Sequence, residues 1–238
     1  MPANLDDLEA LLVCGDWLLD RGHPRGALIA LQLGAERSGG GTFEADIFEL
    51  VTTEKKRLLG PQLAAAMPSR QASWNTFLEV VFRRGFADSI SLHDPVPNSG
   101  ALLALQSMGE NPNFVYLRSL CLVPGELDPV LAFICEKTGD VQVSAPPVGS
   151  GLPRLWPLET LLLGGELGTE SIEHLRWLAL RLCEIDLRRV RMDKHDLKHL
   201  EAYAEDFSML KRLVLNARYG AEKLRALRRH CPNLVFIQ

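Results

Sequence analysis

Leucine or isoleucine recurs at the first, fourth and sixth positions of four short segments in the C-terminal part of the chain. These segments begin at Leu117, Leu158, Leu182 and Leu210. The fourth and sixth positions are two residues apart, so their side chains point to the same face of an extended strand. The pattern therefore predicts a series of β-strands, each with one buried apolar face.

The same alternation extends to seven inward-facing pairs between residues 90 and 236. Consecutive pairs are separated by 30, 21, 20, 24, 28 and 21 residues, and all but the first separation fall within the range of roughly 20 to 29 residues that is typical of leucine-rich repeats. Helical periodicity in most of the intervening segments predicts a short solenoid with a parallel sheet. The pairs are Ile90/Leu92, Leu120/Leu122, Val141/Val143, Leu161/Leu163, Ile185/Leu187, Leu213/Leu215 and Leu234/Phe236.

The repeats depart from the leucine-rich consensus at one position. The asparagine expected three residues after the second strand leucine is replaced by Glu166, Val190 and Arg218 in three of the repeats. We therefore expect irregular curvature. Residues 146–157 contain four prolines and two glycines, so this repeat is the one in which a helix is least expected.

Helical periodicity dominates the chain before residue 77. Residues 5–18 have the apolar spacing of a helix, which Gly22 ends, and a second helix is expected over residues 24–35. A third helix is expected over residues 44–59. Two strand-like segments within residues 77–92 are separated by Arg-Arg-Gly, which predicts a β-hairpin that leads into the repeats.

The first two helices carry a longer motif. Residues 15–18 read Gly-Asp-Trp-Leu, residues 21–26 read Arg-Gly-His-Pro-Arg-Gly, and Leu-Gln follows at 31–32. This motif resembles the bacterial repeat-companion domain, and looser similarity continues through Phe-Arg-Arg-Gly-Phe at 82–86. The resemblance implies a helical domain that precedes leucine-rich repeats, has no catalytic activity and takes part in interactions.

The motif also has a physical interpretation. Asp16, Arg21 and Arg25 surround one tight helix-turn-helix, where a carboxylate can bind a guanidinium and cap backbone donors. Because Trp17 lies beside them in the sequence, the spacing favours a buried structural clamp over a functional site. Loss of the Asp16 carboxylate is then expected to destabilise the turn.

The composition is that of an ordinary globular protein, with 47% hydrophobic and 24% charged residues in a chain of 238. The first residues are acidic and have no apolar leader, and no uncharged run is long and apolar enough to span a bilayer. We therefore expect a cytoplasmic protein. Its five cysteines are scattered and form no C-x-x-C pair, which predicts reduced thiols in the core.

The charge is distributed unevenly along the chain. Residues 176–238 have 14 Lys and Arg against 8 Asp and Glu, so this stretch carries +6 and the preceding residues carry −10. A basic stretch can attract nucleic acid or an acidic protein. Many of its basic residues fall on predicted helices, which favours a solvated outer surface, and nucleic-acid binding is kept as the alternative.

The sequence contains no convincing catalytic pattern. His195 and His199 lie four residues apart on a predicted helix and could hold zinc, but Asp196 replaces the glutamate of zinc hydrolases and no third ligand follows. The glycines at 39–41 lack the Lys-Ser/Thr of a phosphate loop, and neither a nucleophile elbow nor a dinucleotide fingerprint occurs. We therefore expect no enzymatic activity, no metal, no cofactor and no small-molecule substrate.

Residues between the inward leucines should point to the opposite, exposed face of the sheet. Leu162 and Val214 would there be exposed apolar residues near charged ones, and with Asp186 they would form one row across neighbouring strands. The N-terminal helices or a second copy of the chain could instead cover this face. The expected partner-binding residues are Gln142, Leu162, Glu184, Asp186, Arg188, Arg212, Val214 and Asn216.

Together these patterns predict an α/β protein with a helical domain in residues 1–76, which the resemblance identifies as a repeat-companion domain. A hairpin and a short leucine-rich-repeat-like solenoid with a parallel sheet are expected in residues 77–238. The expected function is non-enzymatic binding of a cytoplasmic protein, with neither a membrane nor nucleic acid as the favoured partner. By analogy with larger leucine-rich-repeat proteins, the partner would be a hydrolase that this chain inhibits or regulates.

Overall fold

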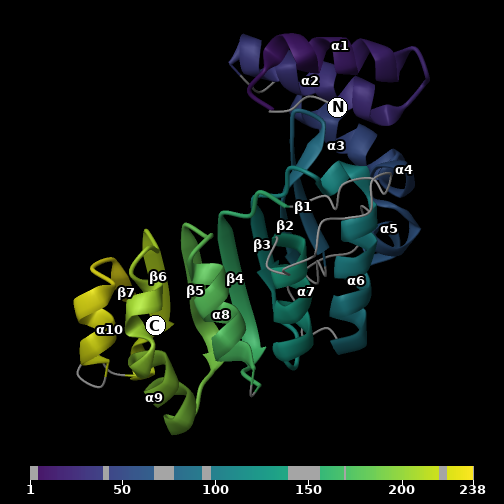
Figure 1. Cartoon of the computed structure of the whole chain (residues 1–238). Coiled ribbons are helices and arrows are strands. Elements are labelled where there is room, and N and C mark those ends of the chain that lie inside the picture. The colour runs from purple at the N-terminus through teal and green to yellow at the C-terminus, as the bar shows by residue number, and fades with distance from the viewer. Residues whose placement is uncertain are drawn as a thin grey trace, which may run out of the picture. The chain divides into compact units, whose positions relative to one another are not determined.

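The computed structural model describes residues 5–39, 43–66, 78–92, 98–138, 156–168, 170–219 and 224–237. These residues form a mixed α/β fold with ten α-helices and an open, mostly parallel sheet of seven strands (Figure 1). The strands are neighbours in chain order, from β1 to β7. The chain divides into two compact units, residues 1–90 with 107–117 and residues 91–106 with 118–238.

The first unit is built mainly from short helices. Its elements are α1 (Leu8–Leu19), α2 (Pro24–Ser38), α3 (Glu44–Thr53), α4 (Lys55–Leu59), α5 (Pro61–Ala66), β1 (Leu78–Arg83) and most of β2 (Phe86–Leu92). Asp7 begins α1 by accepting a hydrogen bond from the Ala10 N–H, and Gly39 ends α2 with a φ of 81°. The single helix expected over residues 44–59 is wrong, because the helix is interrupted at Glu54.

The predicted turn between β1 and β2 is present. Arg84 and Gly85 have φ values of 51° and 83°, which are the conformations that a two-residue type I′ turn requires. Gln32 of α2 holds the turn from one side. Its side-chain nitrogen donates to the Phe82 carbonyl at 2.7 Å, and its side-chain oxygen accepts from the Gly85 N–H at 2.7 Å.

The core of the first unit lies between the helix pair α1–α2 and β2. Leu11 and Leu18 of α1 and Ile29 of α2 are buried against Phe86, the first residue of β2. The Tyr116 ring packs edge-on against the Phe86 ring, with 4.9 Å between the ring centroids. These contacts explain why the apolar positions of the first two predicted helices recur at helical spacing.

The second unit alternates strands with helices and short turns. Its elements are α6 (Asn98–Glu110, which ends in the first unit), β3 (Ser119–Leu122), α7 (Asp128–Thr138), β4 (Thr160–Glu166), α8 (Ser171–Ala179), β5 (Glu184–Arg191), α9 (Lys194–Ala202), β6 (Arg212–Asn216), α10 (Arg225–His230) and β7 (Leu234–Ile237). Strands β3 to β7 are parallel neighbours, so right-handed connections place the intervening helices on one face of the sheet. Figure 1 shows α7 and α8 on that face.

The register of the parallel strands aligns the predicted leucine positions. Leu120, Leu161, Ile185, Leu213 and Leu234 are paired from strand to strand. The first four are buried, as expected for side chains that point toward the helices, and the last is half-buried. The predicted inward direction is therefore confirmed from β3 to β6.

One expected strand falls outside this alignment. The pair Val141/Val143 and most of the proline-rich stretch 146–157 lie outside the described residues. Strand β3 pairs directly with β4, with Leu122 opposite Leu163. Among the helices that the structure describes, none is both long and apolar enough to cross a bilayer.

Candidate functional site

A β-bulge changes the direction of side chains in the middle of the second unit. Leu162 of β4 is paired with Asp186 of β5, whereas Gly164 is paired with Arg189. Strand β5 therefore contains one more residue than β4 between these two pairs, which is the definition of a bulge. As a result, the consecutive residues Arg188 and Arg189 both line a hollow, together with Cys121 and Leu162, which alternate with the inward leucines of β3 and β4.

This hollow, called the sheet hollow below, has a volume of about 330 Å³. Its lining comes from β2, β3, β4 and β5 and from the residue that follows β3. The lining combines small polar side chains, two apolar leucines and a cluster of charges. The lining residues are Ser91, Ser119, Cys121, Val123, Leu162, Leu163, Asp186, Arg188 and Arg189.

Asp186 holds Arg188 in place at the edge of the sheet hollow. The Asp186 carboxylate is only 2% exposed, and it accepts a hydrogen bond from the Arg188 N–H at 3.0 Å. The guanidinium of Arg188 contacts the same carboxylate, with Nε at 2.8 Å and Nη2 at 2.6 Å from Oδ2. Because these contacts are charge-assisted, the direction of the Arg188 side chain is fixed by its own strand.

Arg189 lies beside this pair and is exposed. Within the described residues, Arg189 makes no ion pair. Gly164 on β4 leaves the space for it, because a Cβ atom at Gly164 would lie 3.1 Å from the Arg189 Cβ and 2.9 Å from a methyl carbon of Val123. A larger residue at position 164 would therefore push both lining residues away from the strand.

The rest of the lining carries no negative charge. Burial raises the pKa of the Cys121 thiol above its usual value, and this effect outweighs the nearby positive charge of Arg189 and a hydrogen bond with Ser91. The Cys121 side chain is therefore a neutral thiol at neutral pH. Ser119 precedes it on β3 and contributes a hydroxyl to the same hollow.

Three predicted partner-binding residues meet in the sheet hollow, namely Leu162, Asp186 and Arg188. The expected row across the strands is confirmed, because the register pairs Cys121 with Leu162, Leu162 with Asp186, and Asp186 with Val214. Glu184 and Arg212 are paired on β5 and β6 and form an ion pair at 2.6 Å.

The remaining predicted residues are placed differently. Val214 is fully buried, and Asp186 is almost so, which means that the expectation of exposed side chains at these two positions is wrong. Parallel strands lie about 4.8 Å apart, so a short side chain between longer neighbours is shielded from water. Asn216 donates a hydrogen bond to the Arg188 carbonyl at 3.1 Å, and Gln142 lies outside the described residues.

Sequence reasoning missed Arg189, although a signal for it was present. Leu187 and Val190 are both apolar and both buried, yet they are three residues apart. Strict alternation cannot point two residues at this spacing to the same side of a strand. The odd spacing therefore marks the bulge and predicts that two adjacent side chains face the hollow.

The turn between α1 and α2 differs from the expected buried clamp. Asp16 is exposed and Trp17 is 53% exposed. Arg21 stacks on the Trp17 ring at 3.9 Å and donates to the Trp17 carbonyl, while Arg25 is buried with its guanidinium 4.9 Å from the Phe86 ring centroid. Aromatic rings therefore contact both arginines, and the expectation that Asp16 forms a buried clamp is wrong, because Asp16 is exposed.

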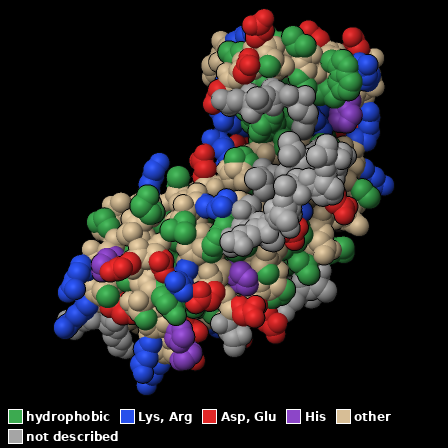
Figure 2. Space-filling view, viewed as in Figure 1, with side chains coloured by type: hydrophobic (Ala, Val, Ile, Leu, Met, Phe, Trp, Pro, Cys, Tyr) green, Lys and Arg blue, Asp and Glu red, His purple; other side chains and the backbone are tan. Residues whose placement is uncertain are grey.

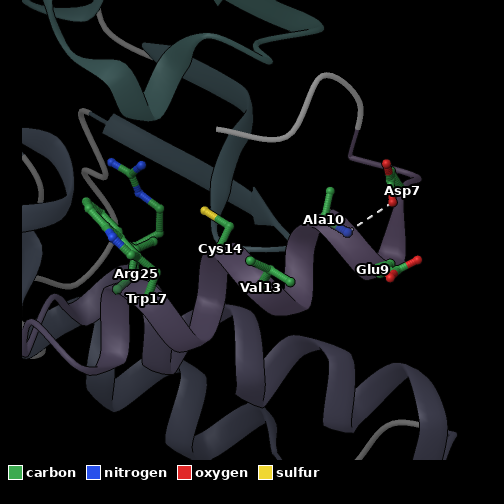
Figure 3. Close-up of a pocket in the computed structure, with 8 residues that line it drawn as sticks. Asp7, Glu9, Ala10, Val13, Cys14, Trp17 and Arg25 are labelled. Atoms are coloured by element: carbon green, nitrogen blue, oxygen red, sulfur yellow. Dashed lines mark hydrogen bonds between the residues drawn. The ribbon is translucent and has the colours of Figure 1, made fainter.

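A second hollow, of about 670 Å³, follows α1 in the first unit (Figure 3). Val13 and Trp17 project from the helix there, and Arg25 lies at one end. At the other end Asp7 caps the helix through Ala10. This hollow is apolar along α1, and its charged groups are separated by the length of the helix.

The structure also places the residues considered for metal and nucleic-acid binding. His195 and His199 are exposed on α9 with 4.2 Å between their ring centroids, and no group of three or more metal-ligating side chains occurs within the described residues. Lys and Arg side chains are interspersed with acidic ones on the helix-bearing side (Figure 2).

No known protein family, curated protein or solved structure matches the chain.

Proposed function

We propose that this protein is a non-enzymatic interaction module that binds another protein through the outward face of its sheet, centred on the sheet hollow. The single observation that carries the proposal is that Leu162, Asp186 and Arg188 meet in one hollow on the predicted face. In this proposal the second unit is an irregular leucine-rich-repeat solenoid, and the helices before residue 77 are a repeat-companion domain.

The chemistry of the face suits a protein partner. Leu162 is a half-buried apolar side chain next to the guanidinium of Arg188, and the Glu184–Arg212 ion pair lies one strand further along. An apolar anchor beside arginine, surrounded by polar groups, is the composition of an interface hot spot with its rim. A regulatory or inhibitory role toward a cytoplasmic hydrolase is the more specific form of the proposal, by analogy.

The test compares two leucines on opposite sides of the second unit. Leu162→Glu changes the sheet hollow, and Leu180→Glu changes a leucine that is 60% exposed at the end of α8. A partner should be recovered with the tagged wild-type chain and with Leu180→Glu, and its affinity for Leu162→Glu should be at least about 30-fold weaker, or roughly 2 kcal/mol. Thermal unfolding of both variants serves as the control for loss of fold.

The opposite pattern would contradict the proposal. If Leu162→Glu binds the partner as tightly as the wild type and Leu180→Glu does not, the helix-bearing side is the binding surface. If both variants bind equally well, the partner contacts neither region, and the outward face has no role in its recognition.

A second candidate function, nucleic-acid binding, is favoured by the exposed basic side chains on α9 and α10. Lys198 on α9 and Arg225 on α10 are exposed, and Glu201 of α9 accepts hydrogen bonds from the first N–H groups of α10. Such binding would weaken steeply as salt is raised. Charge reversal at Lys198 and Arg225 should abolish it and should leave protein binding at the sheet hollow unchanged.

A further inference from the structure

The charges of the sheet hollow do not balance. Asp186 and Arg188 form an ion pair at 2.6 Å, so their charges cancel. Arg189 adds one positive charge that has no described carboxylate partner, and the Cys121 side chain is neutral. The hollow therefore carries one net positive charge, although the whole chain has a net charge of −4.

The geometry of Arg188 leaves donors available for a ligand. A guanidinium has five N–H groups, and the Arg188–Asp186 contact engages the edge formed by Nε and Nη2. The Nη1 end is not needed for that contact. The Arg188 side chain is 38% exposed, so part of it can be reached from solvent.

The size and the walls of the hollow suit one acidic side chain. A volume of about 330 Å³ is ample for a carboxylate with its methylene groups. Leu162 and Val123 provide apolar contact for methylene groups, while Ser119 provides a hydroxyl. The outward face continues past the hollow to the Glu184–Arg212 pair on β5 and β6. A partner that contacts this whole face would place a side chain in the hollow, rather than the end of its polypeptide chain.

Resting on the proposed function, we propose that the sheet hollow receives the carboxylate of an Asp or Glu side chain of the partner protein, bound by the guanidinium groups of Arg188 and Arg189. Planar guanidinium groups match carboxylates in geometry and bind them more strongly than neutral donors do. In this arrangement Asp186 is a positioning residue that holds Arg188, and Arg189 supplies the unmatched charge.

The first experiment uses three short peptides as probes and nuclear magnetic resonance of the full chain as the readout. Acetylated and amidated Ala-Glu-Ala should shift the side-chain signals of Arg189 and Leu162. The same peptide with Gln should bind at least about tenfold more weakly, because it loses the charge-assisted contacts. Acetyl-Ala-Ala-Ala with a free C-terminus tests the other source of a carboxylate, and it should also bind more weakly than the Glu peptide.

Two arginines of one strand provide matched variants. Arg189→Gln should reduce the affinity for the Glu peptide at least about fivefold, and Arg189→Lys, which keeps the charge, should lose less. Arg191→Gln is the control, because Arg191 lies two residues further along β5, pairs with Glu166 at 3.1 Å and does not line the hollow. Equal effects of Arg189→Gln and Arg191→Gln would overturn the inference. So would equal binding of the Glu and Gln peptides, tighter binding of the free C-terminus, or no shift at the hollow.

The same variants separate this inference from the proposed function. If Leu162→Glu abolishes binding of the partner while Arg189→Gln leaves it intact, the partner uses the face without a carboxylate in the hollow, and only the further inference fails. If neither variant weakens the partner, both proposals fail. Loss of binding with both variants, together with the peptide results expected above, supports both.

Discussion

His23 uses a ring nitrogen, rather than a hydroxyl or a carboxylate, to cap a helix. The N–H of Arg25 donates to Nδ1 of His23 at 3.2 Å, at the start of α2. This contact requires an unprotonated Nδ1. Burial lowers the pKa of His23 below 6.5, and the positive charges of Arg25 and Arg57 lower it further.

This cap should make stability depend on pH. Because the native pKa lies below 6.5, the unfolded chain binds a proton at a higher pH than the native chain does. The contribution of His23 is therefore complete above pH 6.5 and decreases as the pH falls from 6.5 toward the native pKa. Urea denaturation at a series of pH values across this window should show the decrease.

The matched variant is His23→Asn, whose amide oxygen can accept the same N–H and does not titrate. It should lose less stability than the wild type over the same pH window. If the two chains lose stability in parallel as the pH falls, another group is responsible for the dependence.

Gly165 is a residue whose identity is fixed by its backbone and by its neighbours. Its φ is 115°, and a Cβ atom would collide with the carbonyl oxygen of Pro124. Gly39 also has a positive φ, of 81°, but a Cβ atom there would meet nothing within 4 Å. Gly165→Ala should therefore cost about 3 kcal/mol of unfolding free energy, and Gly39→Ala about 1 kcal/mol. Chemical denaturation of the two variants measures the difference, and equal losses would contradict the collision argument.

At the scale of elements, the parallel strands depend on one row of aliphatic side chains. Leu161 is fully buried between Leu120 and Ile185 in the register of the sheet. Leu161→Ala should lower the free energy of unfolding by about 2 to 5 kcal/mol, because it leaves a cavity between the sheet and the helices that cover it. Leu180→Ala, at a position that is 60% exposed, should cost less than about 0.5 kcal/mol. Comparable losses in denaturation experiments would show that the row is not the main support of the sheet.

The direction of side chains in the strands could be predicted from the sequence where the strands alternate regularly, and not where a bulge interrupts the alternation. Alternation placed Leu120, Leu161, Ile185 and Leu213 correctly, because a buried face demands apolar residues at every second position. It failed after Leu187, where the bulge adds a residue. An outward position also does not determine exposure, because neighbouring side chains bury Asp186 and Val214.

The helices show a similar division. Local signals placed the end of α1 and the start of α2 closely, since Gly22 and Pro24 act locally, whereas the caps Asp7 and Gly39 were not identified from the sequence. The interruption at Glu54 has no proline or glycine to mark it, and periodicity across it is continuous enough to suggest one helix. The sheet hollow could be predicted only in part, because it depends on Gly164, Ser91 and Arg189 coming together from separate segments.

At the scale of the whole molecule, the first unit is not contiguous in sequence. Residues 107–117 belong to it, although residues 91–106 belong to the second unit. The side chain of Asn113 donates to the Leu58 carbonyl at the end of α4, and Phe114 and Leu117 are fully buried. The boundary expected after residue 76 stays a prediction, and sequence patterns gave no sign that a later segment returns to the first unit.

This interleaving predicts how truncated chains behave. A fragment of residues 1–92 lacks the fully buried side chains of Phe114 and Leu117. It also lacks Asn111 and Asn113, whose side chains donate to the Leu58 carbonyl. Removing a buried phenylalanine alone costs about 3 to 5 kcal/mol, which is comparable to the stability of a small unit. The fragment should therefore unfold without a cooperative transition in circular dichroism. A fragment of residues 1–117 restores these groups and should regain a cooperative transition. If both fragments melt alike, the segment 107–117 contributes little to the first unit, and its buried residues stabilise only the intact chain.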